Sequence, residues 1–453
     1  MSRALALLLA FAAAAVFYAH AWPSAPVAEP DTAGYLEVAE DLRDGQLSKL
    51  WSRPPGYPLL LLATGSAPAP GRTLFALQLG MHFAAVALLA ALLVRLRSPR
   101  LLVVAFALVA LLPPFVEHAA FALTETLVAL LLTAGLVGLS WWLIGGAWLP
   151  LAGSAVALAG VGLVHPAYAV LAPALGFAVA LGAVLPAATR GLRRRALPAV
   201  GALALATVVG PGGFAAHNAL VLGTPGLSSM LGVTLSHKTV RLWDRIPDDG
   251  SGVREILIRE RDALLTKPGA DHLAYGAIYR ALPELKRQTG LDELALDRLL
   301  VRVNLALIRE APLEYFDEVA RSLVWYWSPG VTDLSSFGSG ALGALWHLVR
   351  ALVLLGFGVT VVLVAGPAVR FALAHAPSSE PEREDPLSSQ FVVLGLACAT
   401  IVLSMLLHAG LTAAVWRFRV PVDLWILAST GIAAQAASAL ARRMPLARTL
   451  PAG

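Results

Sequence analysis

The chain has 453 residues, of which 58% are hydrophobic and only 14% are charged. Soluble domains carry roughly 25% charged residues, so this composition excludes an ordinary soluble protein and predicts an all-α protein that crosses a membrane many times. The net charge of +5 comes from arginines grouped in short loops, which is a signal of membrane topology, and we expect no nucleic-acid partner. The single cysteine, Cys398, excludes an intrachain disulfide.

Ten apolar segments are candidates for membrane-spanning helices, because a span needs about 20 apolar residues. In chain order they are Ala4–Ala21, Thr73–Val94, Leu101–Phe115, Thr126–Ile144, Leu149–Leu163, Ala167–Leu185, Ala196–Ala216, Ala341–Val364, Phe391–Leu407 and Val420–Leu440. The third and fifth are short, and the fifth and sixth could form one hairpin broken at 164–166. The first could be a signal peptide, but its apolar core is longer than the roughly 7–15 residues usual there, so we expect it to be retained.

Clustered arginines predict the orientation of these segments, because basic loops stay in the cytoplasm. The clusters are 95–100, 190–195, Arg370 and 442–448. With Arg3 also inside, ten spans place all of them on the cytoplasmic side of the plasma membrane. The chain then divides into three parts. They are an N-terminal transmembrane module (1–216) with an outer loop at 22–72, an outer helical region (217–340), and C-terminal spans (341–453) with a cytoplasmic linker at 375–389. The outer region contains amphipathic patterns at Val253–Leu265 and Leu291–Trp325, which predict helices packed on the outer membrane face.

The first outer loop contains an amphipathic pattern. Tyr35, Val38, Ala39 and Leu42 recur at the spacing of one helix face, which predicts a helix lying on the membrane surface with its apolar side down. Asp31 stands where the N-cap of this helix belongs. It is either that cap alone or a general base as well, and a helix N-terminus favours its ionised form in both cases.

The same loop ends in Arg53-Pro54-Pro55-Gly56-Tyr57-Pro58. Three prolines forbid a regular helix across the segment and predict an extended backbone beside the membrane. The segment could be a simple bend before the chain re-enters the bilayer. A bend does not require an arginine, however, and Arg53 is suited to bind a phosphate group at the bilayer surface.

This loop resembles the GT-C superfamily of membrane glycosyltransferases, closest to the branch with protein O-mannosyltransferases and aminoarabinose transferases. The similarity rests on Asp31 just after the first span, a tyrosine four residues on, and a basic residue followed by Pro-Pro. Three further segments are similar in the same order. They are LTETLVALLL (Leu123–Leu132), HNALVLGTPGLSS (His217–Ser229) and WRFRVPVDLWIL (Trp416–Leu427), so the similarity covers nearly the whole chain.

The resemblance implies a GT-C fold and an inverting enzyme that takes a sugar from a polyprenyl-phosphate donor. The acceptor would be a lipid, glycan or protein of the cell envelope, reached at the outer membrane face. Asp31 corresponds to the family's catalytic base, and Arg53 to the basic residue that faces the lipid phosphate. Arg417 or Arg419 corresponds to the late arginine near that phosphate.

Two departures from the family bear on metal binding. Thr32 stands where many relatives have a second acid, and Ser52 where some have an acidic metal ligand. The motifs therefore predict no cofactor and do not support a bound metal ion, although a divalent cation stays an open alternative. The late arginines are predicted on the outer side, against the positive-inside bias. Either they bind the phosphate of a lipid, or Arg417 and Arg419 are a snorkelling pair that anchors the last helix.

Five further residues are candidates for contacts with substrates: Tyr35, Tyr57, Glu117, Glu125 and His165. Each has a structural alternative. Glu125 and its neighbour Thr124 could simply cap the first turn of a helix, and His165 could be a hydrogen-bonded structural histidine at the tip of a hairpin.

Polar residues near the other outer segments have plainer interpretations. His237, Lys238 and Arg241, at the start of the large outer region, could cap the site, but we expect them to lie on a solvated face. Asp423 is an acid inside a predicted span, where such residues are rarely idle. It is four residues after Arg419, so the two can pair on one helix face.

A transporter or flippase of lipid-linked sugars is the main alternative function, and a non-catalytic assembly factor that binds lipid carriers is the second. Transporters place ionisable or unwound sites near the middle of the membrane, often in two related halves. The segment 126–189 contains no Asp, Glu, Lys or Arg, and the polar residues gather at the predicted outer face. This distribution favours an enzyme whose site lies at the membrane surface.

Overall fold

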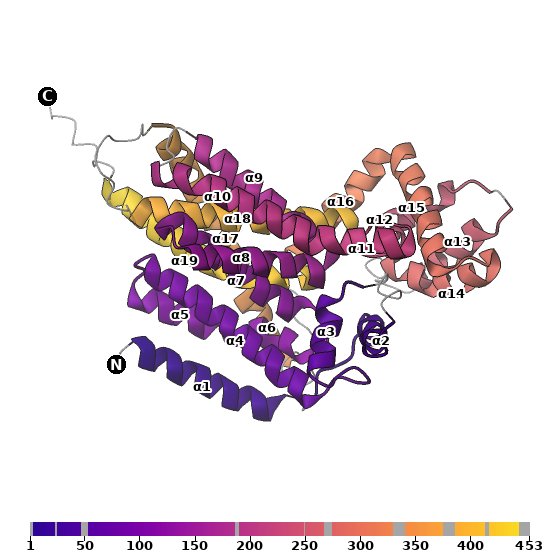
Figure 1. Cartoon of the computed structure of the whole chain (residues 1–453), viewed down its shortest axis with the longest axis horizontal. Coiled ribbons are helices and arrows are strands. Elements are labelled where there is room, and N and C mark those ends of the chain that lie inside the picture. Colours follow the sequence, from indigo (N-terminus) through magenta and orange to yellow (C-terminus); the bar gives the residue numbers. More distant parts are fainter. Residues whose placement is uncertain are drawn as a thin grey trace.

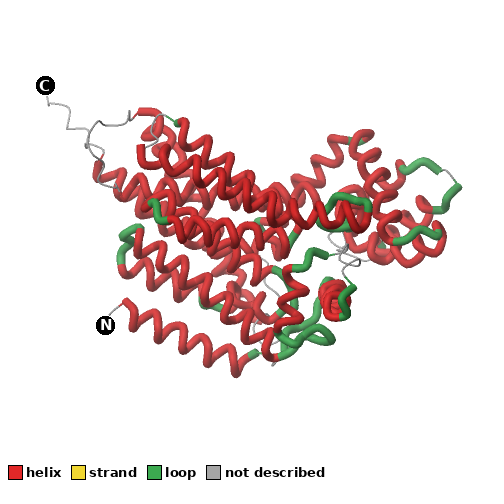
Figure 2. Tube along the Cα trace, in the orientation of Figure 1, coloured by secondary structure: helices red, strands yellow, loops and turns green. Residues whose placement is uncertain are grey.

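The structure, a computed structural model, describes residues 3–22, 25–46, 53–185, 190–248, 250–266, 274–328, 340–374, 386–412 and 416–443. Every regular element among these residues is a helix, and the only β feature is an isolated bridge between Val27 and Phe121. Figure 2 shows these helices and the loops that connect them in the described part of the chain. The predicted all-α class is therefore confirmed for the described part of the chain.

Most helices run side by side in one bundle (Figure 1). They are α1 (Arg3–Ala21), α4 (Arg72–Arg95), α5 (Arg100–Ala110), α7 (Glu125–Gly145), α8 (Trp148–Val164), α9 (Leu171–Val184), α10 (Arg190–Thr207), α17 (Gly340–Ala374), α18 (Pro386–Leu411) and α19 (Val420–Arg443). Eight helical segments of the described residues are long and apolar enough to cross a membrane. Helices suit this setting because they satisfy every backbone hydrogen bond internally. The chain is thus a multi-pass membrane protein.

Two of the ten predicted spans, the third and the fifth, are not among these eight segments. The third is broken, because α5 and the next helices, α6 (Pro113–Val116) and η2 (Glu117–Ala120), meet at a bend of 66°. Proline lacks an N–H and clashes with the preceding turn, so the pair at 113–114 explains the break. The fifth is α8, which has only 17 residues. Counting the bent pair gives nine spans, and the number ten remains a prediction.

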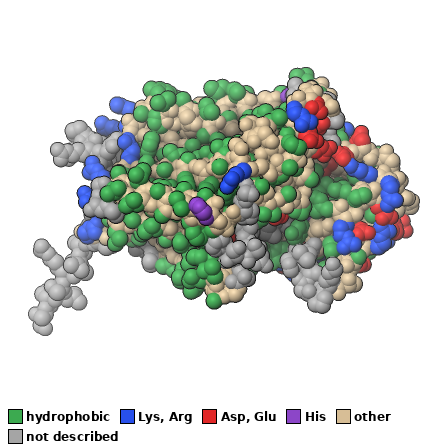
Figure 3. Space-filling model, turned by 90° about the horizontal axis from the view of Figure 1, so that it is seen from below, with side chains coloured by type: hydrophobic (Ala, Val, Ile, Leu, Met, Phe, Trp, Pro, Cys, Tyr) green, Lys and Arg blue, Asp and Glu red, His purple; other side chains and the backbone are tan. Residues whose placement is uncertain are grey.

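The two ends of the bundle differ in charge. Helix α1 begins and α19 ends at one end, while the helices that lie between α11 (Gly213–Leu222) and α17 in the chain are at the other (Figure 1). Figure 3 shows basic side chains without acids at the first end, apolar side chains between, and mixed charges at the second. This distribution is the one that the positive-inside rule describes for a cytoplasmic and an outer side.

A second group of helices packs beyond the bundle and has its own hydrophobic core. They are α12 (Leu231–Thr239), α13 (Val253–Leu265), α14 (Ala277–Thr289) and α15 (Glu293–Glu310), and we call them the distal region. The next helix, α16 (Pro312–Tyr326), packs against α18 of the bundle. The amphipathic pattern predicted α13 with its observed bounds. The second predicted pattern, 291–325, is two helices, because Pro312 begins a new one.

Helices α2 (Thr32–Arg43) and α3 (Gly56–Ala63) connect α1 to α4 at the end of the bundle that faces the distal region (Figure 1). The predicted apolar face of α2 is confirmed, since Tyr35, Val38 and Ala39 are buried. The extended backbone predicted across 53–58 is wrong from Pro55 onward, because Pro55 has helical backbone angles and α3 begins at Gly56. Proline is tolerated in a first helical turn because its missing N–H would have no partner there.

The linker predicted at 375–389 is described only in its last four residues. These belong to helix α18, which begins at Pro386, so that part of the linker prediction is wrong. Residues 375–385 lie outside the described part of the chain.

Candidate functional site

The carboxylate of Asp31 lies between two arginines from distant parts of the chain. Arg53 donates to one oxygen at 3.1 Å, and Arg417 donates to the other at 2.8 Å. Arg53 precedes α3, and Arg417 belongs to the 3₁₀ turn η7 (Trp416–Arg419) that leads into α19. Asp31 does occupy the N-cap position of α2, but its side chain makes no capping hydrogen bond. The hypothesis that Asp31 only caps its own helix therefore does not fit the geometry.

Thr32 explains how this segment is held without an Asp31 cap. The Thr32 hydroxyl donates to the carbonyl oxygen of Ala122 at 2.9 Å and accepts the backbone N–H of Glu29 at 2.8 Å. These bonds fix the start of α2 against the segment before α7, and they leave the Asp31 side chain to the arginines.

Glu125 completes the charged cluster. Its Oε1 lies 3.1 Å from Nε of Arg417, and its Oε2 is buried without a hydrogen-bond partner among the described residues. Thr124, the N-cap residue of α7, makes no side-chain capping bond either. The guanidinium of Arg53 also lies over the ring of Tyr35, 4.8 Å from its centroid. The two acids of the cluster, Asp31 and Glu125, and its two arginines, Arg53 and Arg417, therefore have no net formal charge.

The arginines control the ionisation of Asp31. Burial raises the pKa of the Asp31 carboxyl, but Arg53 and Arg417 favour the charged form more strongly, and the net pKa lies below the ordinary value of 3.8. Asp31 is therefore ionised at neutral pH. An anionic ligand that drew one arginine away would raise this pKa and make the carboxylate a stronger base.

A large cavity opens beside this cluster, between the end of the bundle and the distal region. Its volume is about 1650 Å³, larger than the roughly 300–1,000 Å³ of pockets for small ligands. Six of the predicted site residues line it, namely Asp31, Tyr35, Arg53, Glu125, His165 and Arg417. Burial lowers the pKa of His165 to about 3, so its ring is neutral, and Nδ1 has no partner among the described residues.

Three predicted site residues do not line the cavity. Tyr57 is buried and donates to Oε1 of Gln78 at 2.9 Å. Arg419 is fully buried and donates to the backbone oxygens of Tyr326 and Ser328 at 2.5 and 2.9 Å. Glu117, the third, pairs with a buried arginine described next. In this structure these three positions are structural.

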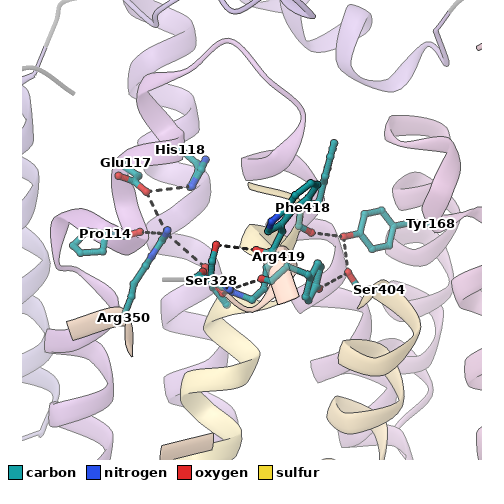
Figure 4. A network of polar contacts seen from close by, with 12 residues as sticks. Pro114, Glu117, His118, Tyr168, Ser328, Arg350, Ser404, Phe418 and Arg419 are labelled. Carbon is teal, nitrogen blue, oxygen red and sulfur yellow. Dashed lines mark hydrogen bonds and ion pairs between the residues drawn. The ribbon is translucent and has the colours of Figure 1, made fainter. Parts of the chain in front are cut away.

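Arg419 and Glu117 belong to a buried ion network (Figure 4). Arg419 pairs with Asp423 at 2.7 Å, which confirms the predicted pair. Arg350 of α17 lies 3.5 Å from the other oxygen of Asp423 and 3.2 Å from Glu117. The network joins α17, η2 and α19, and it fixes η7, the turn that carries Arg417.

Sequence reasoning missed part of the cavity wall. The expectation of a solvated face for His237 and Lys238 is wrong, because both side chains are buried. His237 lines the cavity with Tyr275, from the short turn before α14, and Tyr279, from the first turn of α14. Two tyrosines four residues apart were the only available signal.

Among the described residues, no group of three or more His, Cys, Asp and Glu side chains is arranged to hold a metal ion. Ser52, one of the two departures from the family pattern, lies outside the described residues. The absence of metal and cofactor remains a prediction.

Comparison with protein-family models, curated proteins and solved structures finds no match to this chain. What the fold and the site define is therefore a class, an all-helical multi-pass membrane protein with a charged cavity at one end of its bundle. The GT-C resemblance rests on the sequence motifs.

Proposed function

We propose that the protein is a GT-C-type membrane glycosyltransferase, which transfers a sugar from a polyprenyl-phosphate donor to a cell-envelope acceptor. The observation that carries this proposal is the Asp31 carboxylate held between Arg53 and Arg417 in a large cavity at the end of an apolar bundle. We place the cavity on the outer side of the plasma membrane, because the basic residues gather at the opposite end.

The chemistry is a single displacement. A hydroxyl or amine of the acceptor attacks the anomeric carbon of the donor sugar, and Asp31 accepts the proton that the nucleophile loses. The bond between that carbon and the phosphate oxygen breaks, and its electron pair leaves with the polyprenyl phosphate. Arg53 and Arg417 stabilise the negative charge that develops there.

The paired state of Asp31 gives the donor a specific role. Without donor, each arginine binds one oxygen of Asp31, so this carboxylate occupies the N–H groups that we assign to the donor phosphate. A donor phosphate competes for the same N–H groups and frees Asp31 to act as a base. The base then becomes strongest when the sugar is in place.

Loss of Arg417 tests this assignment. The Arg417→Ala variant is expected to bind radiolabelled polyprenyl phosphate about tenfold to a hundredfold more weakly, since hydrogen bonds to charged groups contribute about 1.5–3 kcal/mol. Arg43→Ala serves as the control, because Arg43 is exposed at the end of α2 and, among the described residues, pairs with its neighbour Asp44. Equal affinity of both variants and the wild type would contradict a phosphate site at Arg417.

The pH dependence of transfer should report the Asp31–Arg53 pair. Ionised Asp31 accepts the proton, so kcat/KM falls as pH drops through its pKa, which lies below 3.8. In Arg53→Gln one favourable charge is gone while burial remains, so the pKa rises and activity is lost at a higher pH than in the wild type. If kcat/KM of Arg53→Gln falls at the same pH as in the wild type, or at a lower pH, Asp31 is not the titrating base.

Transport of lipid-linked sugars is the competing function. A transporter carries its ligand across the bilayer without breaking a covalent bond. Recovery of the labelled sugar still attached to its lipid, on the opposite side of a proteoliposome, would support transport and contradict transfer.

A further inference from the structure

Three aromatic rings form a cluster on the cavity wall contributed by the distal region. The ring of His237 contacts Tyr279 with centroids 5.4 Å apart and Tyr275 with centroids 5.6 Å apart. All three residues line the cavity. Tyr279 is 43% exposed, whereas His237 is buried. A ligand in the cavity can therefore contact the Tyr279 ring, and the His237 ring packs against that tyrosine.

One ring nitrogen of His237 is available to a ligand at this wall. Its Nδ1 lies 3.0 Å from the Thr412 hydroxyl, while its Nε2 is buried with no hydrogen-bond partner among the described residues. Burial, with the nearby Lys238 charge, lowers the pKa of His237 to about 4, so the ring is neutral at neutral pH. Buried polar atoms normally have a partner, and a ligand in the cavity can supply one.

The cluster also lies close to the reacting groups. The Tyr279 phenol is near enough to Asp31, Arg53 and Arg417 for their charges to act on it, and burial together with the Asp31 charge raises its pKa to about 12. The charge of Asp31 acts on His237 too. A ligand held by the rings would therefore lie beside the proposed base.

We propose that His237, Tyr275 and Tyr279 form a binding site for a sugar ring. A pyranose has an apolar C–H face, which packs on an aromatic ring, and an edge of hydroxyl groups, one of which can pair with Nε2 of His237. An acyl chain would leave that nitrogen without a partner. The three rings carry no charge to bind an ionic ligand, and the nearby Arg53 and Arg417 already bind the Asp31 carboxylate. The inference rests on the proposed function, in which both donor and acceptor can carry a sugar.

Saturation-transfer NMR tests the site directly, with the full-length protein in lipid nanodiscs and a panel of methyl hexopyranosides as probes. The wild type is expected to transfer saturation to the C–H protons of at least one probe. Tyr279→Ala should weaken that binding about tenfold or more, whereas Tyr279→Phe should bind like the wild type because it keeps the ring. His237→Phe keeps a ring but removes the nitrogen, so it should also bind more weakly.

Phe316→Ala is the matched control, because Phe316 is an exposed aromatic residue of α16 that lies outside the cavity lining. The inference is overturned if no probe binds the wild type, or if Tyr279→Ala binds as tightly as Phe316→Ala. Failure of the proposed function looks different, because the probes would still bind while no polyprenyl-phosphate sugar is turned over.

Two rates in Tyr279→Ala, donor hydrolysis without acceptor and sugar transfer, show whether the bound sugar belongs to the donor or to the acceptor. If the ring holds the donor sugar, hydrolysis of the donor in the absence of acceptor will fall. If it holds an acceptor sugar, that hydrolysis will be unchanged and only transfer will fall. Both results support a sugar site, and unchanged values of both rates would overturn it.

Discussion

Asp31→Asn is expected to lower the rate of sugar transfer by about 10³-fold, within the range usual for loss of a general base. Asparagine keeps the size of the side chain but cannot accept the proton of the nucleophile. Removing the negative charge also removes the internal competitor for Arg53 and Arg417, so polyprenyl phosphate should bind at least as well as in the wild type. The measurements are transfer of labelled sugar and binding of polyprenyl phosphate by the same purified protein.

The control for this variant is Asp44→Asn, at the other end of α2, where the carboxylate is exposed and pairs with Arg43. It should transfer sugar at nearly the wild-type rate. Normal transfer by Asp31→Asn would remove the catalytic assignment. Loss of transfer together with loss of phosphate binding would instead mean that Asp31 organises the site.

Arg350→Met is expected to destabilise the protein by about 3–5 kcal/mol, as is usual when one partner of a buried ion pair is removed. Arg350 is 2% exposed and lies between Glu117 and Asp423. Methionine fits the apolar surroundings but leaves a carboxylate without its counter-charge. Unfolding by titration with a denaturing detergent, monitored by circular dichroism, measures the change.

A second substitution separates charge from packing. In Arg350→Met with Glu117→Gln the buried network is again balanced, so part of the lost stability should return. Arg43→Met removes an exposed pair and should cost no more than about 1 kcal/mol. If Arg350→Met is as mild as Arg43→Met, the network does not hold α17 against α19.

Much of the fold follows from local pattern. Long apolar segments form helices in a membrane because helices satisfy their own backbone hydrogen bonds. The spacing of Tyr35, Val38 and Ala39 was enough to predict α2. The bend at Pro113 and the early start of α3 at Gly56 were harder, because proline breaks a helix or begins one depending on the turn in which it falls.

The candidate site was predicted only in part, for a geometric reason. Asp31 and Arg417 are 386 residues apart, and no spacing rule brings them together. The sequence offered Arg417 and Arg419 as equal candidates. In the 3₁₀ turn η7, with three residues per turn, residues two apart point in different directions, so Arg417 lines the cavity and Arg419 is buried with Asp423.

The distal region shows where sequence patterns stop being informative. Its amphipathic helices were predicted, but amphipathicity says only that one face is buried, not what covers it. His237 has polar neighbours in the sequence and was expected at a solvated surface. The fold instead places it against Tyr275, Tyr279 and Thr412, which come from two other helical segments.

The most direct test of glycosyl transfer is turnover of a panel of labelled polyprenyl-phosphate sugars by the purified protein, with envelope extract as the source of acceptor. We predict that at least one labelled sugar leaves its lipid and appears on an acceptor, releasing polyprenyl phosphate in equal amount, and that Asp31→Asn abolishes this product. If the wild type leaves every sugar on its lipid, the protein is not a glycosyltransferase of this class.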